Sequence, residues 1–225
     1  MPYRKTVFAN SEVYHIFSRG HGNQQIFRDN KDYQRIVESL VFYLYSDPPL
    51  RYSHFKRLSN ERKQKVFEDF DNQNTNMDVI AYCFLPTHYH LLVRQTKDSG
   101  VQNTVRKFQN SYAKYFNTKY KLKGLVFQSP FKAAHLENDY QIVQISRYIH
   151  LKPKIAVVTQ KDKVDTYEWS SLSEYIKPDE NSMLSPDVIL NSFANPQEYK
   201  NFILNEEDYQ REIKKVKSVT LDKKI

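Results

Sequence analysis

Residues 81–93 read AYCFLPTHYHLLV, which places two histidines inside an apolar run with high β-propensity. A proline interrupts the run, so we expect one strand over residues 77–84 and a second strand that the histidines open. Because side chains alternate along a strand, His88 and His90 point to one face and Tyr89 points to the other. Two imidazoles on one strand face can serve as a pair of metal ligands.

The histidine pair is a short motif, and on its own it is equally compatible with two half-exposed histidines near a strand end. Other features of the sequence are needed to distinguish a metal site from a structural role for the histidine pair. A metal-dependent enzyme of the hydrolytic or transfer type also needs a nucleophile, and Ser, Cys and Tyr are the candidates.

Composition narrows the classes of function. The chain has 225 residues, a net charge of +8 and a pI near 9.3, and it contains 17 Tyr and 14 Phe. A basic, aromatic-rich surface favours phosphate-bearing partners such as nucleic acids. The chain has only four glycines, which excludes a P-loop and a dinucleotide-binding fingerprint.

Cys83 is the single cysteine, which excludes an intramolecular disulfide and a cysteine-rich zinc module. The first residues lack the apolar segment of a signal peptide, and no stretch is long and apolar enough for a membrane span. We therefore expect a soluble protein of the cytoplasm.

Hydrophobic periodicity predicts alternating strands and helices along the chain. After a first strand come a helix capped by Asn30, the two strands around the proline, a second helix, a further strand and a third helix that ends at Lys152 and Pro153. The residues expected in the outer elements are 13–19, 30–44, 101–117, 125–134 and 138–152. The order β, α, β, β, α, β, α indicates an α+β fold, a ferredoxin-like or RRM-like antiparallel sheet with helices packed on it.

The sequence predicts one domain that contains an insertion and is followed by a C-terminal extension. Residues 1–176 form the predicted catalytic domain, and a polar stretch at about 47–76 is an insertion within it that carries one short helix near residues 61–70. Residues 177–225 form a helical C-terminal extension, with a last helical region from residue 196 to about 216.

Tyr148 is the nucleophile candidate, because it follows the histidine strands on a helix whose end is set by Pro153. A lone helical tyrosine more often packs in a core or an interface, so its position alone does not establish the role.

Eight segments occur in the order found in the single-tyrosine HUH transposases of the insertion-sequence type, and most closely in the REP-associated tyrosine transposases. They are YHIFSRG (14–20), QIFRD (25–29), AYCFLPTHYHLL (81–92), YFN (115–117), GLVFQ (124–128), FK (131–132), RYIHLKP (147–153) and WSS (169–171). The chain resembles this family over about residues 13–176.

The resemblance implies that His88 and His90 ligate a divalent ion, Mg²⁺ or Mn²⁺, and that Tyr148 is the catalytic nucleophile. It implies a single-stranded DNA endonuclease and transposase that forms a 5′-phosphotyrosine intermediate, without ATP, and acts as a monomer or homodimer. Its partner would be single-stranded DNA, commonly beside a hairpin.

One residue departs from the family pattern. The family usually supplies a third metal ligand, Asn or Gln, one helical turn after the tyrosine, where this chain has Lys152. A protonated lysine has no lone pair for a metal. Three interpretations stay open: Lys152 places a positive charge beside the scissile phosphate, it leaves a water as third ligand, or it marks a protein that has lost cleavage and kept DNA binding.

The expected DNA contacts are basic and polar side chains along the same domain. Residues 97–132 carry many Lys and Arg interleaved with aromatic residues, which is typical of a groove for single strands. The residues assigned to DNA binding are Arg19, Arg106, Lys107, Lys114, Gln128, Lys132 and Lys152.

Two other classes of protein compete with this interpretation. A two-histidine phosphoesterase needs His-x-Ser/Thr motifs, and no histidine of the chain is followed two positions later by Ser or Thr. A non-catalytic nucleic-acid module would explain the charge but not the histidine pair. The alternative that remains is a catalytically impaired or domesticated DNA-hairpin-binding protein of the same fold.

Overall fold

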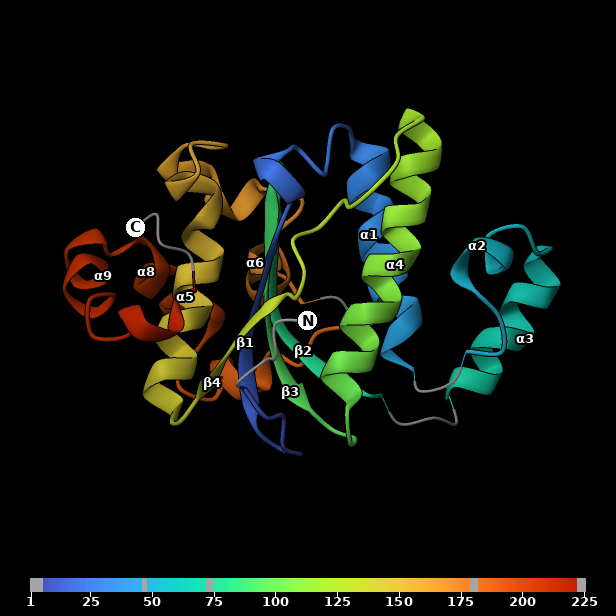
Figure 1. Ribbon diagram of the computed structural model, residues 1–225. Helices are drawn as coiled ribbons and strands as arrows, with labels where there is room; N and C mark the ends of the chain where they lie inside the picture. Colours follow the sequence, from blue (N-terminus) through green and yellow to red (C-terminus); the bar gives the residue numbers. More distant parts are fainter. Residues whose placement is uncertain (1–5, 46–47, 72–74, 179–181, 222–225) are drawn as a thin grey trace.

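A four-stranded antiparallel sheet lies at the centre of the protein, with helices on both faces (Figure 1). The computed structural model describes residues 6–45, 48–71, 75–178 and 182–221. The strands are β1 (Val13–Arg19), β2 (Met77–Leu85), β3 (His88–Gln95) and β4 (Lys132–Leu136), in the spatial order β2-β3-β1-β4. This order and the intervening helices confirm the predicted ferredoxin-like α+β fold.

Two long helices cover one face of the sheet. They are α1 (Asn30–Leu44) and α4 (Gly100–Tyr120), which pack side by side. Ile16 of β1 and Leu91 of β3 point toward them and are completely buried, together with Phe108 and Tyr112 of α4. The aromatic stripe of α4 therefore forms core, as its helical spacing indicates.

The opposite face is covered by α5 (Asp139–Ile155) and the C-terminal helices (Figure 1). Ala81, Cys83 and Leu92 of the sheet pack there against Ile145 and Ile149 of α5. The C-terminal helices are α6 (Leu172–Ile176), α7 (Asp187–Leu190), α8 (Pro196–Leu204) and α9 (Glu206–Glu212), with the 3-10 turns η2 (Lys161–Thr166) and η3 (Lys217–Val219). β2 is a nearly continuous apolar run, which is consistent with its burial on both faces.

The polar segment predicted as an insertion contains two short helices instead of one. These are α2 (Tyr52–Phe55) and α3 (Asn60–Asp71), which stand beyond α1 and α4 on the side away from the sheet (Figure 1). Rings of Phe55 and Phe70 meet Phe42 of α1 at centroid distances of 5.0 and 5.4 Å, so aromatic packing attaches the pair to the domain. We name residues 48–71 the α2–α3 lobe.

Three predicted boundaries were wrong. Asp29 and not Asn30 caps α1, because its side chain accepts the backbone N–H of Asp32. The strand expected over 125–134 is shorter and later, since only residues 132–136 pair with β1 along a ladder. Helix α5 continues past Pro153 to Ile155.

The segment Tyr167–Ser171 runs along the free edge of β2. The backbone N–H of Phe84 donates to the carbonyl of Trp169 at 2.9 Å, and the N–H of Ser171 donates to the carbonyl of Tyr82 at 3.0 Å. These bonds supply hydrogen-bond partners for backbone groups at the free edge of β2, and they attach the segment before α6 to the sheet.

Candidate active site

His88 and His90 lie on the face of the sheet that α5 covers. In the register of β1 against β3, Phe17 is opposite His90 and Arg19 is opposite His88. Directly opposed residues of an antiparallel pair share a face, so β1 and β3 together present both histidines, Phe17 and Arg19 toward α5. The ring centroids are 5.3 Å apart for the two histidines and 4.9 Å apart for Phe17 and His90.

A third histidine, which no sequence motif had singled out, completes this cluster. His15 of β1 is completely buried, and its Nε2 lies 2.9 Å from Nδ1 of His90. Its Nδ1 lies 2.7 Å from the carbonyl oxygen of Val219 in η3. The C-terminal extension therefore reaches the histidine cluster through a backbone carbonyl.

These two hydrogen bonds assign the tautomer of His90. The Val219 carbonyl only accepts, so Nδ1 of His15 carries the hydrogen and, in the neutral ring, Nε2 of His15 accepts. His90 must then donate from Nδ1, which leaves its Nε2 with a lone pair. This Nε2 is buried and has no hydrogen-bond partner among the described residues.

The surroundings of His90 favour its neutral form. Burial, followed by the positive charge of Lys152 and the neighbouring His15, lowers the pKa of His90 well below the usual value of 6.5. A neutral imidazole with a bare Nε2 is the form that binds metals. His88 has Nδ1 placed 2.9 Å from the hydroxyl of Thr87, the residue at the tight turn between β2 and β3.

Tyr148 and Lys152 face the same cluster from α5. The Tyr148 ring meets His90 edge-on at a centroid distance of 5.5 Å and His15 at 5.9 Å. One turn later, the Lys152 ammonium donates to the Tyr148 hydroxyl at 3.1 Å. Tyr148 is 0 % exposed and Lys152 only 2 %, so the structure brings the predicted nucleophile, the histidines and the lysine into one enclosed group.

His150 belongs to the core and is completely buried. Its Nδ1 lies 2.7 Å from the Tyr199 hydroxyl of α8 and its Nε2 lies 2.8 Å from the hydroxyl of Ser171. Burial lowers the pKa of His150 to about 3, so the ring is neutral and fully hydrogen-bonded.

The donor set fits a divalent ion held by two imidazoles. The bare Nε2 of His90 is an unpartnered buried atom of the kind that a metal would satisfy, and His88 presents a second ring on the same face. In the described part of the chain no group of three or more His, Cys, Asp and Glu is placed to share an ion. Lys152 occupies the place of the third ligand.

The predicted DNA contacts divide between the two faces of the molecule. Arg19 and Lys132 both lie over the Phe17 ring, with the Arg19 Cζ at 5.5 Å and the Lys132 Nζ at 5.6 Å from its centroid. Gln128 is tied to this end of β1, since its backbone N–H donates to the Arg19 carbonyl at 2.8 Å. These three residues border the histidine face.

The basic residues of α4 do not border it. Arg106, Lys107 and Lys114 are on the helix that covers the opposite face of the sheet. They therefore lie on the other side of the sheet from His88 and His90, and their contact with DNA stays a prediction. The periodicity of α4 indicated its basic side but could not say which face of the sheet the helix covers.

A protein-family model described as "Transposase IS200 like" matches residues 46–152, the stretch that contains the histidine pair, Tyr148 and Lys152. The resemblance to IS200-like transposases is confirmed. No curated protein sequence matches the chain.

A solved structure shares the fold of this chain. It is a REP-associated tyrosine transposase bound to a REP hairpin, 13 % identical, with a TM-score of 0.53, over 81 % of this chain and 90 % of that one. A candidate transposase from Deinococcus radiodurans R1 is 14 % identical, with a TM-score of 0.35, over 66 % of this chain and 95 % of that one. Within the described residues, no helix has the length and apolar character needed to cross a bilayer.

Proposed function

We propose that this IS200-like chain is a transposase that cuts single-stranded DNA with Tyr148 and joins strands through a 5′-phosphotyrosine intermediate. The observation that carries the proposal is the contact of Tyr148 with Lys152 at 3.1 Å, beside the neutral ring of His90, in one buried group. The family match to residues 46–152 supports the class of reaction.

The proposed step is a displacement at phosphorus. The Tyr148 oxygen forms a bond to the phosphorus of a DNA phosphodiester, and the bond to the 3′ oxygen of the preceding nucleotide breaks. That oxygen takes the electron pair and a proton and leaves as a 3′-hydroxyl, while the phenolic proton passes to water. A later 3′-hydroxyl reverses the step on the phosphotyrosine, which conserves the bond for strand transfer.

Lys152 is suited to the electrostatic part of this step. Its ammonium donates to the oxygen on which negative charge develops as the phenol ionises, and a buried, fixed donor stabilises such charge more strongly than water does. This contact supports the first of the three interpretations of Lys152, in which the lysine supplies positive charge at the reacting group.

His88 and His90 would hold the divalent ion, Mg²⁺ or Mn²⁺, which supplies charge neutralisation at a non-bridging phosphate oxygen. The role of this chain's residues is to present imidazoles with a bare nitrogen. His90 donates to His15 and His15 donates to the Val219 carbonyl, and these hydrogen bonds fix the tautomer of His90. Such outer hydrogen bonds orient a metal-binding histidine.

The DNA strand would approach from the end of β1. Arg19 and Lys132 flank the Phe17 ring there, and phosphate contacts combined with an aromatic face are typical of single-strand binding. The hairpin in the structure of the REP-associated transposase supports a hairpin-flanked strand as the substrate. Since Tyr148 is completely buried, cleavage requires that α5 and the sheet separate enough to admit a phosphodiester.

Covalent capture tests the proposal. The protein is incubated with a hairpin-flanked single-stranded oligonucleotide and Mn²⁺, and a protein–DNA band that survives denaturation is sought. Wild type is expected to form the band, Tyr148→Phe to bind DNA with nearly the same affinity and form none, and His88→Ala or His90→Ala to lose both the band and its metal dependence. A band that persists in Tyr148→Phe would contradict the proposal.

A second candidate is a DNA-hairpin-binding protein of the same fold that no longer cleaves. Lys152, at the position where the resemblance implies a third metal ligand, favours it. Tight hairpin binding by a wild-type protein that forms no adduct with Mg²⁺ or Mn²⁺ would select this alternative.

A further inference from the structure

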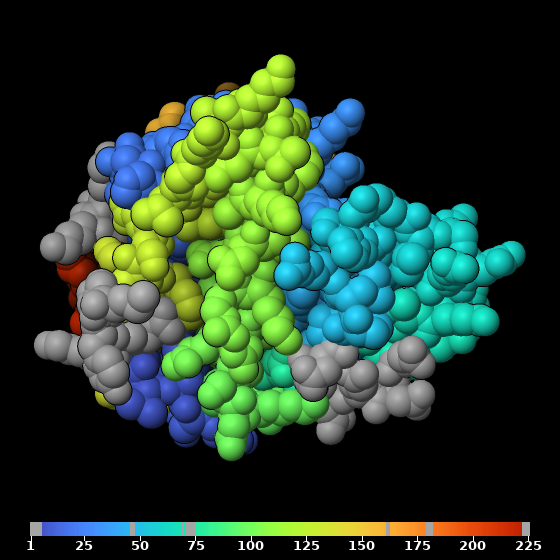
Figure 2. Space-filling model, turned by 45° about the vertical axis from the view of Figure 1, so that its right-hand side comes forward, coloured from blue at the N-terminus to red at the C-terminus, as the bar shows by residue number. Residues whose placement is uncertain are grey.

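A large cavity lies between α1, α4 and the α2–α3 lobe. Figure 2 shows the lobe standing beside α4 on this side of the molecule. The cavity has a volume of about 990 Å³, at the upper end of the range for ligand sites. The whole sheet separates it from the candidate active site.

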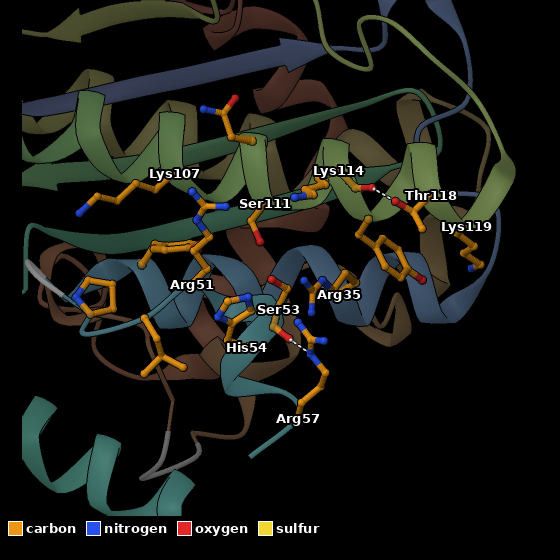
Figure 3. A pocket seen from close by; sticks show the side chains of 15 residues that line it. Arg35, Arg51, Ser53, His54, Arg57, Lys107, Ser111, Lys114, Thr118 and Lys119 are labelled. Carbon is orange, nitrogen blue, oxygen red and sulfur yellow. Dashed lines mark hydrogen bonds between the residues drawn. The ribbon is translucent and has the colours of Figure 1, made fainter.

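Positive charge lines this cavity. Side chains from α1, α2 and α4 face the same space (Figure 3), and six of the lining residues are Lys or Arg. They are Arg35, Arg51, Arg57, Lys107, Lys114 and Lys119. Of the lining residues, all in the described part of the chain, none is Asp or Glu.

Arg35 is the most informative of these cations. Its guanidinium lies over the Tyr52 ring at 4.2 Å and near the Tyr115 ring at 5.3 Å, and its Nε is buried without a hydrogen-bond partner in the described structure. Burial lowers the pKa of Arg35. The nearby carboxylate of Glu38 is already bound by Lys56 at 3.0 Å and by the Tyr52 hydroxyl. Glu38 and the neighbouring tyrosines offset part of the cost of burying this cation, and a bound anion would offset more of it.

Helix α4 contributes a regular polar stripe to the cavity. Lys107, Ser111, Lys114 and Thr118 follow one another at intervals of three or four residues, and so share one face of the helix. Arg106 is one position off this stripe and does not line the cavity. Two of the three α4 cations predicted to bind DNA therefore belong to a separate site.

We propose that this cavity binds a short segment of single-stranded DNA, away from the phosphodiester that Tyr148 cuts. The identity of the ligand as DNA rests on the proposed function. A hollow that combines cations with the rings of Tyr43, Tyr115 and His54 suits a strand whose phosphates and bases are both accessible. A duplex fits this cavity less well, because its base faces are stacked inside and it presents a convex backbone to the protein.

DNA binding at the cavity can be measured under conditions in which Tyr148 cannot cut DNA. Tyr148→Phe protein in the presence of a chelator is titrated with a fluorescent oligothymidylate at several salt concentrations. The test variant adds Arg51→Ala and Lys114→Ala, two exposed cations from opposite walls of the cavity. The matched control adds Lys31→Ala and Lys65→Ala, which remove the same charge from exposed positions outside the cavity.

The test variant is expected to bind about tenfold more weakly than the control. Its slope of log affinity against log salt should fall by about 0.7 for each DNA phosphate that the protein no longer neutralises. Equal affinities in the two variants would overturn the proposal. So would a duplex of the same length that displaces the oligothymidylate as well as unlabelled single strand does.

The outcomes separate this inference from the proposed function. If wild type forms no covalent adduct but the cavity variant binds DNA more weakly than the control, the cavity proposal holds and the nuclease proposal fails. If the adduct forms and the two variants bind alike, the nuclease proposal holds and the cavity proposal fails.

Discussion

Lys152 stands where a metal ligand is expected, and its surroundings show what it contributes instead. Its ammonium donates to the Tyr148 hydroxyl, lies 4.7 Å from the centroid of that ring and helps to lower the pKa of His90. A single cation thus lies beside both the predicted nucleophile and a predicted metal-binding histidine, where its charge would repel a bound ion.

Replacing this lysine separates the two effects. Lys152→Asn should tighten Mn²⁺ binding by about tenfold, or about 1.4 kcal/mol, because it adds a neutral oxygen and removes the repulsion. Calorimetric titration of both proteins measures the change. If Lys152 supplies charge at the reacting group, wild type still nicks DNA at metal concentrations too low to fill its site, whereas the variant nicks only once its own site is filled. Identical metal affinities would mean that Lys152 does not act on the histidine pair.

His15 is the residue through which the C-terminal extension acts on the site. His15→Phe keeps a ring but removes the acceptor of the His90 Nδ1–H, so nothing fixes the tautomer and orientation of His90. We expect Mn²⁺ affinity to fall by about 10- to 100-fold. His135→Phe, which replaces an exposed histidine on the neighbouring strand, is the control. Unchanged affinity in His15→Phe would show that the Val219–His15–His90 chain has no role in metal binding.

At the scale of single elements, α5 joins the site to the C-terminal helices. One side of this helix carries Tyr148 and Lys152 toward the sheet, and His150 points instead to Ser171 and to Tyr199 of α8. The prediction that α5 ends at Pro153 was wrong. Proline has no backbone N–H, but because Pro153 lies in the last turn, only one helical hydrogen bond is lost and the helix continues to Ile155. Bonds from Ala156 to Lys152 and from Val158 to Pro153, both 2.8 Å, maintain the end of the helix.

The packing of His150 predicts how stability depends on pH. Its pKa is about 3 in the folded protein and near 6.5 unfolded, so between these values only the unfolded chain binds the proton. The contribution of His150 to the free energy of unfolding is therefore complete above pH 6.5. It is lost as pH falls toward 3, by up to about 1.4 kcal/mol per pH unit.

Denaturant unfolding at several pH values measures this slope. His150→Gln should flatten it between pH 6.5 and the acid limit, and His21→Gln, at an exposed position, should leave it as in wild type. Equal slopes in wild type and His150→Gln would contradict the account of α5 packing.

In the whole molecule, the sheet separates the two proposed sites. The face under α5 holds the histidines and Tyr148, and the helices on the other face form the basic cavity with the α2–α3 lobe. Alternation and helical spacing are local properties, so they predicted the order of the elements, the common face of His88 and His90, and the pairing of Tyr148 with Lys152 along one helix.

Contacts between distant segments could not be predicted in this way. His15 meets His90 only because β1 pairs with β3, and Val219 reaches His15 from a separate turn at the end of the described chain. The position of α4 opposite the histidine face likewise depends on which side of the sheet each crossover helix takes. The spacing of residues within α4 does not indicate which face of the sheet the helix covers.

We propose that Tyr148 is the residue that becomes joined to DNA. Proteolysis of the adduct formed with Mn²⁺ and a hairpin-flanked single strand, followed by mass spectrometry, identifies the modified peptide directly. We expect a nucleotide-bearing peptide that contains Tyr148, linked through the 5′ phosphate. A modified peptide that contains Tyr140 or another tyrosine, with Tyr148 unmodified, would contradict it.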